Sequence, residues 1–406
     1  MNKNIKLAVA GAVLALSASA NAGIIIPAGE WTLDINGNVN AFASWIKADH
    51  ANTVTGGMAV LKDANSEKNT QGINTGLLPA WLGFTATTRQ NDLDVAWTMS
   101  MQPNVSDVGN GDAGTPLFRQ ANLSFGDKSW GSFKLGKDIG IFASQAILND
   151  MTLLGVGAFT GAVHTGSNTG TTHGGIGTGY IYAAWKGQIA YTTPNFNGFQ
   201  ATVGITNPNQ GLAGTQTNNT AGNSLYQDRF GLEGQAVYSF AGDALSGKVW
   251  AGAASYKVKQ LVTGSAYVEN TATVTDIGAN LNAGGVGLTG YYYTGEGAGT
   301  TVMLGNGYST AGQKRDSDGG YLQATYILPT KTKLGVAYGV SKLDLAAAET
   351  AGSSFVKHNK RTTVGLYHPL TKHLNLVAEF NDIEAEAHSG VRNENTSVST
   401  GAILFF

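Results

Sequence analysis

The stretch KLGVAYGVS, from Lys333 to Ser341, alternates large apolar residues with glycine, alanine and serine. A period of two is typical of a β-strand whose two faces meet different surroundings. The core of a β-sandwich would take up large apolar residues, whereas a wide polar interior accepts small and polar ones. Because only small residues share the second face here, the stretch favours a strand in the wall of a barrel. The large residues are Leu334, Val336, Tyr338 and Val340.

The same alternation returns elsewhere in the chain. LDVAWTMSMQ, from Leu93 to Gln102, and LNLVAEFN, from Leu374 to Asn381, each place small or polar residues between apolar ones. About 16 strands are predicted in all, an even number as in bacterial outer-membrane barrels. They are expected to start near Trp31, Trp81, Leu93, Phe118, Gly131, Tyr180, Phe199, Arg229, Lys248, Thr273, Gly285, Gly320, Lys333, Arg361, Leu374 and Thr396.

The composition supports a membrane barrel. The chain has 406 residues, of which 56 are glycine, none is cysteine and 13% are charged. Soluble proteins carry about 25% charged residues. No stretch reaches the ~20 apolar residues that a membrane-spanning helix needs. A chain that enters a bilayer without such helices must close its sheet, because a closed sheet leaves no unpaired edge. The fold class predicted is all-β, a transmembrane antiparallel β-barrel.

The N-terminus reads as an export signal. Lys3 and Lys6 precede the apolar run Leu7–Leu16, and small residues up to Ala22 supply a cleavage site. We therefore divide the chain into a signal peptide, residues 1–22, and one barrel domain, residues 23–406; the alternative is a short N-terminal helix. Removing the signal takes two of the 25 basic residues and none of the 27 acidic ones, which leaves a net charge of −4. A chain with this charge lacks the positively charged surface by which proteins bind nucleic acid. In a pore, the same negative charge predicts a weak preference for cations.

Short and long connections alternate along the chain, as they do when turns lie at one end of a barrel and loops at the other. The third long connection, Asp138–Gly179 (loop 3), holds 10 glycines. A loop of this length in a compact fold is normally functional. The other long connections are Asp49–Gly76, Pro103–Pro116, Asn207–Asp228 and Thr294–Asp318.

Aromatic residues gather near the expected strand ends, where Tyr and Trp favour the boundary between lipid and water. Core packing is the alternative for any single member. The residues are Trp31, Trp45, Trp81, Tyr191, Tyr256, Tyr291 to Tyr293, Tyr326 and Tyr367. The last strand ends abruptly on an aromatic residue, and its alternate residues Ala402, Leu404 and Phe406 share one face.

Several segments resemble one family, the general trimeric porins of Gram-negative bacteria. FRQANLSFGDKSWGSFKLGKD, from Phe118 to Asp138, resembles a strand pair of that family. Asn149–Met151 resembles the acidic part of its third loop, and Pro194–Phe199 and Tyr326–Thr332 resemble two of its turns. The final Phe406 matches the residue by which the barrel-assembly machinery recognises such proteins.

The resemblance implies a homotrimer and a loop 3 that folds inward to narrow the pore, with basic wall residues facing acids on the loop. The alternative for the loop is an external cover over a neighbouring subunit. The candidate constriction residues are Arg119, Lys134, Lys137, Asp138 and Asp150. Lys137 stands where the family has arginine, and Gly155–Phe159 lacks the family's acid. The strand alternation also puts Lys137 on the lipid side unless a bulge turns it inward. The alternative for Lys137 is therefore a solvated charge at the rim of the barrel.

We therefore expect an outer-membrane channel for passive diffusion of small hydrophilic solutes, without catalysis, metal or cofactor. Its expected partners are outer-membrane lipid and lipopolysaccharide, the assembly machinery and two further copies. A substrate-selective channel, a barrel enzyme and an adhesive β-solenoid are the alternatives. No G-x-S-x-G motif or short repeat is present. The histidines fit no zinc spacing; they are His50, His164, His173, His358, His368, His373 and His388.

Overall fold

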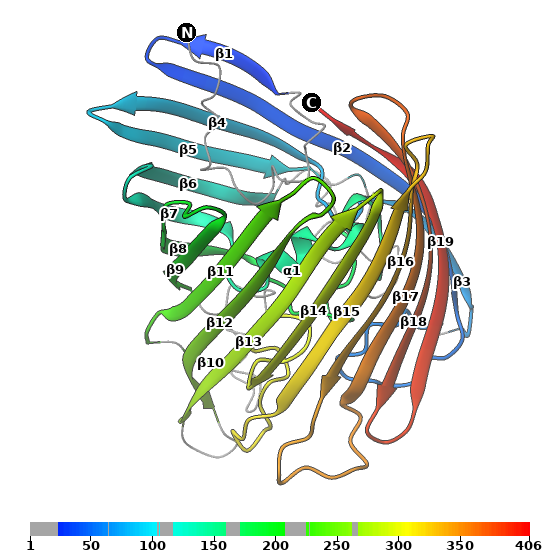
Figure 1. The fold of residues 1–406 in the computed structure, drawn as a ribbon. Helices are drawn as coiled ribbons and strands as arrows, with labels where there is room; N and C mark the ends of the chain where they lie inside the picture. The colour runs from blue at the N-terminus through cyan, green and yellow to red at the C-terminus, as the bar shows by residue number, and fades with distance from the viewer. Residues whose placement is uncertain are drawn as a thin grey trace.

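The computed structural model describes residues 23–63, 65–103, 105, 117–159, 171–207, 225–226, 228–261 and 267–406. In these residues the chain is almost entirely antiparallel sheet wound into a barrel (Figure 1). The predicted signal peptide, residues 1–22, lies outside the described residues. Among the residues described, no helix is both long and apolar enough to cross a membrane.

The strands follow each other round the wall in sequence order. Two short helices, α1 (Ser144–Leu148) and η2 (Met151–Leu154), lie between β7 and β8. The strands are β1 (Ile24–Ala28), β2 (Trp31–Ala48), β3 (Asn69–Asn74), β4 (Trp81–Gln90), β5 (Leu93–Gln102), β6 (Leu117–Asp127), β7 (Gly131–Ile139), β8 (Trp185–Thr192), β9 (Phe199–Thr206), β10 (Leu225–Tyr226), β11 (Gly231–Ala241), β12 (Ser246–Leu261), β13 (Tyr267–Ala283), β14 (Val286–Glu296), β15 (Asp316–Ile327), β16 (Lys333–Leu343), β17 (Val356–Pro369), β18 (Leu374–Ala387) and β19 (Arg392–Phe405).

The barrel closes where β19 pairs with β2, from Phe405 opposite Asn38 to Asn395 opposite Ala48. The 18-residue strand β2 carries β19 and β1 along one edge, and β4 and β3 along the other. Of the 19 described strands, β1, β3 and β10 only extend this wall, and the other 16 form the closed ring. The prediction of a 16-stranded antiparallel barrel is confirmed.

Each expected strand has a counterpart in the ring, with differences at the ends. The strand expected from Tyr180 begins at Trp185, and the strand expected from Thr273 begins at Tyr267. Tyr180 is a buried loop residue instead. Its apolar neighbours imitate a strand because they pack inside the barrel.

The two faces of the wall carry the residues that the alternation predicted. On β16, Leu334, Val336 and Tyr338 are exposed on the outside, whereas Gly335 and Ala337 are buried on the inside. The outside of the barrel is therefore apolar, as a lipid-facing surface must be. The inside is built from small and polar residues, which leaves room for further chain within it.

The prediction that the aromatic residues form a boundary belt is only partly right. Trp45, Tyr292 and Tyr326 are exposed on the outer face. Tyr256, Tyr291, Tyr293 and Tyr367 are buried, because the strand alternation turns these residues toward the lumen. For these four the belt assignment is wrong, and they pack against the loop between β7 and β8.

The wall is uneven in height. Strands β4 to β9 have 8 to 11 residues, whereas β12 and β13 have 16 and 17. Figure 1 shows the shorter strands on one side of the barrel and the longer ones on the other. The C-terminus lies at the end with the short turns, which is the upper end in this view.

Candidate functional site

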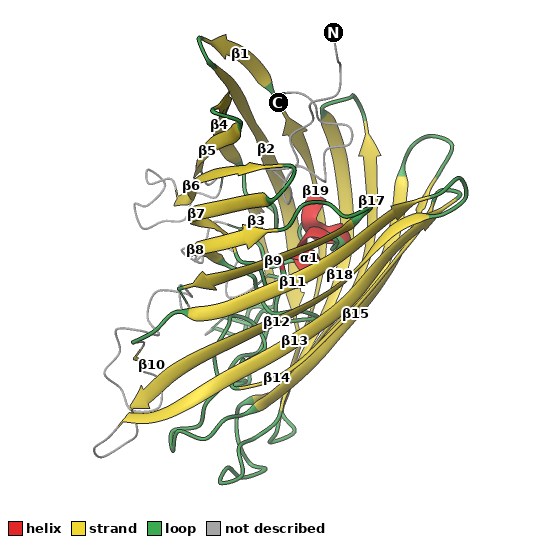
Figure 2. Ribbon diagram, turned by 60° about the vertical axis from the view of Figure 1, so that its left-hand side comes forward, coloured by secondary structure: helices red, strands yellow, loops and turns green. Residues whose placement is uncertain are grey.

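Loop 3 connects β7 to β8, and its described parts, residues 140–159 and 171–184, lie within the barrel. Figure 2 shows α1 enclosed by the wall strands. Phe142, Ile147 and Leu153 of the loop belong to one buried cluster with Tyr291 and Tyr321 of the wall. The inward-facing tyrosines therefore serve as an apolar seat for the loop.

Glu233 of β11 forms the first polar anchor. Its Oε2 accepts hydrogen bonds from the backbone N–H groups of Ile141 and Phe142, each at 2.8 Å. Its Oε1 receives Lys186 Nζ at 2.6 Å and the hydroxyl of Tyr256. All of these side chains are buried. A buried carboxylate is tolerated only with such a full set of donors, so the start of loop 3 is held tightly.

Glu379 of β18 anchors the loop in the same way on the opposite wall. Its Oε2 accepts the N–H groups of Val156 at 2.9 Å and Gly157 at 2.8 Å, while Tyr367 donates to its Oε1 at 2.7 Å. Consecutive backbone N–H groups form a small anion-binding concavity. A Cβ on Gly155 would lie 2.0 Å from Glu379 Oε1, so only glycine lets the backbone approach this carboxylate.

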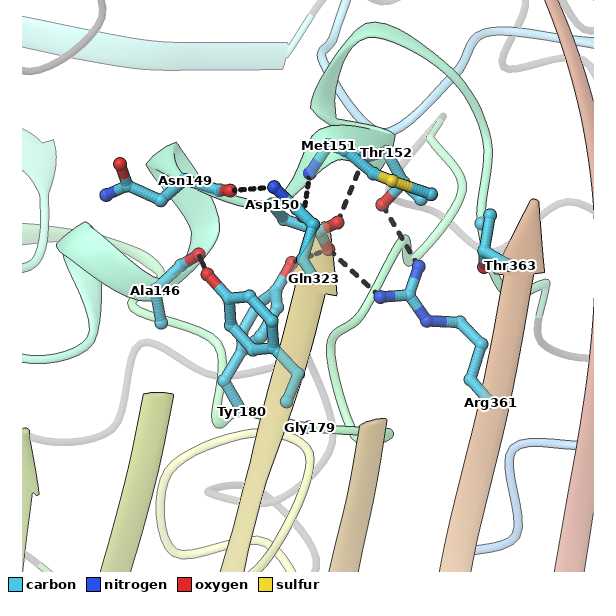
Figure 3. Close-up of polar contacts among 12 residues, drawn as sticks. Ala146, Asn149, Asp150, Met151, Thr152, Gly179, Tyr180, Gln323, Arg361 and Thr363 are labelled. Atoms are coloured by element: carbon cyan, nitrogen blue, oxygen red, sulfur yellow. Dashed lines mark hydrogen bonds and ion pairs between the residues drawn. The ribbon is translucent and has the colours of Figure 1, made fainter. Parts of the chain in front are cut away.

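Asp150 and Arg361 form the third anchor (Figure 3). Asp150 caps η2 by accepting the Thr152 N–H at 2.9 Å, and its Oδ2 lies 3.4 Å from Arg361 Nη2. Arg361 Nη1 also donates to Thr152 Oγ1 at 3.1 Å. Tyr180 donates its hydroxyl to Asp150 at 2.9 Å. Burial, followed by the charge of Asp150, raises the pKa of Tyr180, so this hydroxyl keeps its proton.

Uncharged wall groups complete the attachment near α1. Gln323 Oε1 accepts the Met151 N–H at 2.7 Å, and Gln323 Nε2 donates to the carbonyl of Asn149 at 3.2 Å (Figure 3). The hydroxyl of Tyr321 donates to the carbonyl of Ala146 at 2.8 Å. Loop 3 is thus bonded to β11, β15, β17 and β18, which together span about half of the ring.

The five candidate constriction residues do not form one cluster. Lys134 and Asp138 pair with each other on the inner face of β7, with Nζ and Oδ2 2.6 Å apart. Lys137 lies on the outer face beside Phe133 and Leu135 and donates to the carbonyl of Phe118 at 2.8 Å. The alternation, unbroken between β6 and β7, keeps Lys137 out of the lumen.

A bulge does occur, but one strand earlier. Between β5 and β6 the register shifts so that Ser100 faces Gln120 and Met101 faces Phe118. The extra residue is Arg119, whose side chain is turned inward and buried. It lines a small, mostly apolar cavity of about 80 Å³ beside Tyr182 of loop 3. Of the predicted basic residues, Arg119 and Lys134 face inward. The basic residue that meets Asp150 is Arg361, which the sequence analysis did not name.

Two further loops also enter the barrel. The segment before β3 is held by asparagines of the wall, with the N–H of Met58 2.9 Å from Asn359 Oδ1 and that of Val60 2.8 Å from Asn395 Oδ1. The segment between β14 and β15 reaches loop 3, where Tyr182 N–H donates to the carbonyl of Thr301 at 2.9 Å. Loop 3 is therefore the centre of an internal packing of three loops.

An open cavity of about 490 Å³ lies between loop 3 and strands β12 to β16, at the short-turn end. On one side it is bounded by residues 148–151 of the loop. On the other side its wall is polar, and it is formed by Asn280, Asn282, Gln323, Thr325 and Lys333.

A group of metal-ligand type occurs among the described residues on the outer face, away from this cavity. It consists of His358, Glu384 and Glu386, whose ligand atoms lie within 4.8 Å of one another. The carboxylates are already paired with Lys360 and Arg392, at 2.9 Å and 3.2 Å respectively. The group is a network of surface ion pairs.

The anchor residues Lys186, Glu233, Arg361 and Glu379 were missed in the sequence. Glu379 does occupy the polar half of the alternation in Leu374–Asn381, which marks it as inward-facing. An inward charge on a strand was the available signal. The pairing of Glu233 with Lys186 and the attachment of Glu379 to loop 3 could not be read from the sequence, because these partners lie 47 and 223 residues away.

A family model described as "Gram-negative porin" matches residues 7–388. No curated protein matches the sequence. Among solved structures, the outer membrane channel DcaP of Acinetobacter baumannii aligns with TM-score 0.68 at 16% identity, over 94% of this chain and 99% of that one.

Two other solved structures share the fold. An anion-selective porin from Comamonas acidovorans aligns with TM-score 0.62 at 17% identity, over 93% of this chain and all of that one, 100%. OmpF of Salmonella typhi, in a complex with daunomycin, aligns with TM-score 0.56 at 15% identity, over 94% and 100% of the two chains. At these identities the likeness concerns the fold alone.

Proposed function

The chain belongs to the Gram-negative porin family, whose members are outer-membrane channels for passive diffusion, and from this premise we propose that its loop 3 sets the size limit for the small hydrophilic solutes that cross. The fold and the family are those of a channel and not of an enzyme. Diffusion through a water-filled lumen needs no turnover and no energy source, so selection depends on width and charge.

The observation that carries the proposal is the set of three anchors. Glu233, Glu379 and the pair Arg361–Asp150 hold the backbone of loop 3 at separate points of the wall. A loop fixed at points on several strands acts as part of the wall, and it divides the interior. The water path then runs along the side that the loop leaves open, beside β12 to β16.

Single-channel recording in planar bilayers tests this function. We expect stepwise ohmic currents from the purified barrel, and liposome swelling that slows as the sugar probe grows. Glu379→Ala should shift the size limit upward, because it frees two backbone N–H groups of loop 3. An unchanged size limit in a variant that still folds as a barrel would contradict the role of loop 3. Absence of any conductance would contradict the channel.

We propose that the assembled form is a homotrimer joined through β4 to β9. A structure of OmpT from Vibrio cholerae with TM-score 0.52 is described as a trimer form, at 14% identity. Here the short strands carry large apolar residues on their outer face: Met99, Leu123, Phe133, Ile189 and Val203. Mass measurement in detergent should give three copies, and Leu123→Glu should give one.

The remaining assignments concern export and assembly. We propose that residues 1–22 are a signal peptide removed on export, and that the outer face contacts lipid and lipopolysaccharide. Ala402 and Leu404 lie on the outer face of β19, and Phe406 follows its last residue; these three residues would present the signal that the assembly machinery reads. N-terminal sequencing of the protein from outer membranes should start at Gly23.

A further inference from the structure

The open cavity beside loop 3 carries a local charge that the net charge of the chain does not reveal. In strands β12 to β16, the residues that alternate toward the lumen include three charged ones, Lys248, Asp276 and Lys333. Lys333 lines the cavity directly. Lys248 is the next inward-facing residue after Ser246 on β12, and it lies opposite Asn280 on β13. Ser246 and Asn280 both line the cavity.

Neither lysine is paired with an acid. In the described part of the chain no carboxylate oxygen lies within 4.0 Å of Lys248 Nζ or Lys333 Nζ, although other lysines and arginines of this chain do form such pairs. Lys248 Nζ donates to the neutral side chain of Gln145 on α1, at 2.8 Å. Lys333 Nζ lies over the ring of Tyr367, 4.8 Å from its centroid. Both positive charges are therefore held in place without being cancelled by a contact.

The nearby carboxylates are turned away from the water. Asp150 is buried against Arg361 and Tyr180. Glu379 is 2% exposed and binds two N–H groups of loop 3 together with the Tyr367 hydroxyl. Asp276 is 6% exposed and accepts the hydroxyl of Tyr291 at 3.1 Å. Asp243, in the turn between β11 and β12, is the acid that lines the cavity mouth, and it is exposed to solvent that screens it.

We propose that this cavity is an anion-selective segment of the pore, in which Lys333 at the mouth and Lys248 further in attract small anionic solutes such as carboxylates and phosphate. The inference rests on the proposed diffusion function and names the charge class of its solutes. The amides of Asn280 and Asn282 each donate one hydrogen bond within the wall, at 2.9 and 2.7 Å, and each keeps a second N–H as a neutral donor between the two lysines. Such a wall suits an anion that exchanges part of its hydration shell during passage.

This inference is opposite to the weak cation preference expected from a net charge of −4. Charges on exposed loops are screened within about 10 Å, whereas charges in a narrow lumen with low-dielectric walls act on every ion that passes. The local pair of lysines should therefore outweigh the distant acids.

The test is the reversal potential of single channels in a tenfold KCl gradient. The unmodified channel should give a potential of anion sign. Lys248→Gln and Lys333→Gln should each lower the chloride-to-potassium permeability ratio, by about two- to fivefold. Lys248→Arg and Lys333→Arg, which keep the charge, should retain the ratio. Lys372→Gln, an exposed lysine in a turn at the same end, is the matched control and should leave the ratio unchanged.

The outcomes separate this inference from the proposed function. A channel that conducts with cation sign would overturn the anion-selective segment and leave the diffusion function standing. Equal shifts from Lys372→Gln and from the two cavity variants would also overturn it, because the effect would then be a general surface charge. A folded barrel without conductance would refute the proposed function itself. Lys333→Gln should slow the passage of acetate and phosphate relative to that of potassium.

Discussion

Arg361 and Asp150 lie 211 positions apart in the sequence, yet Nη2 of one and Oδ2 of the other are 3.4 Å apart inside the barrel. Both side chains are fully buried. Removing one member of a buried ion pair leaves an uncompensated charge and costs about 3–5 kcal/mol. The pair therefore makes the seat of loop 3 sensitive to a single substitution on β17.

Arg361→Met should loosen loop 3 while leaving the barrel wall intact. We expect larger and noisier single-channel currents, and faster proteolysis within residues 140–184. The double variant Arg361→Met with Asp150→Asn should recover part of the loss, because no buried charge then lacks a partner. If the excess current noise of the double variant equals the sum of the excess noise of Arg361→Met and of Asp150→Asn, the two residues are not coupled.

Gly155→Ala should disturb the Glu379 anchor without changing any charge. A methyl group at this position would lie 2.0 Å from Glu379 Oε1, so the carboxylate or the loop must move. The expected result is a lower unfolding free energy and a raised size limit in liposome swelling. Gly352→Ala is the control, since a Cβ there would have no atom within 4 Å. If both variants match the unmodified protein, the close approach of the backbone to Glu379 affects neither the unfolding free energy nor the size limit.

Acid should weaken the packing of loop 3 through His173. Burial lowers the pKa of this imidazole to about 4 from the ordinary value near 6.5. The folded state therefore prefers neutral His173, and its stability is complete above pH 6.5 and falls as the pH drops toward 4. The loss approaches about 3 kcal/mol at pH 4.

Thermal unfolding of the unmodified protein and of His173→Gln between pH 7.5 and pH 4 measures this contribution. The variant should show a flatter profile over pH 6.5 to 4, although it starts from a lower stability. Parallel profiles for the two proteins would show that His173 does not titrate in this way.

Phe406→Ala should reduce assembly more than it reduces the stability of barrels already formed. The backbone of Phe406 exchanges two hydrogen bonds with Gly37, at 2.8 and 3.0 Å, and alanine keeps both. Only the aromatic side chain is lost. Heat-modifiable gel migration of outer-membrane fractions should show fewer folded molecules, whereas their melting temperature should change little. A large drop in melting temperature with normal yield would assign the ring to stability.

The sequence allowed the wall to be predicted and left the interior largely unread. Strand alternation depends on neighbouring residues, so stretches such as Lys333–Ser341 reveal both the strand and its outer face. Lys137 was named as a constriction candidate although the alternation pointed it outward, and the structure places it on the outer face. The bulge that turns Arg119 inward depends on the pairing of Gln120 with Ser100 and of Phe118 with Met101 on the neighbouring strand, which local sequence does not encode. The anchors join loop 3 to strands that are far away in the sequence, and no local sequence pattern links the two partners.

Strand β2 has one further consequence. Its upper part pairs with β1 and β4, and its lower part with β19 and β3, so the ring is complete only when the final strand reaches the initial one. Until that moment both carry an unsatisfied row of backbone donors and acceptors, which lipid cannot satisfy. The seam therefore joins the first strand of the ring to the last, and the cylinder stays open to the membrane until the whole chain between them is in place.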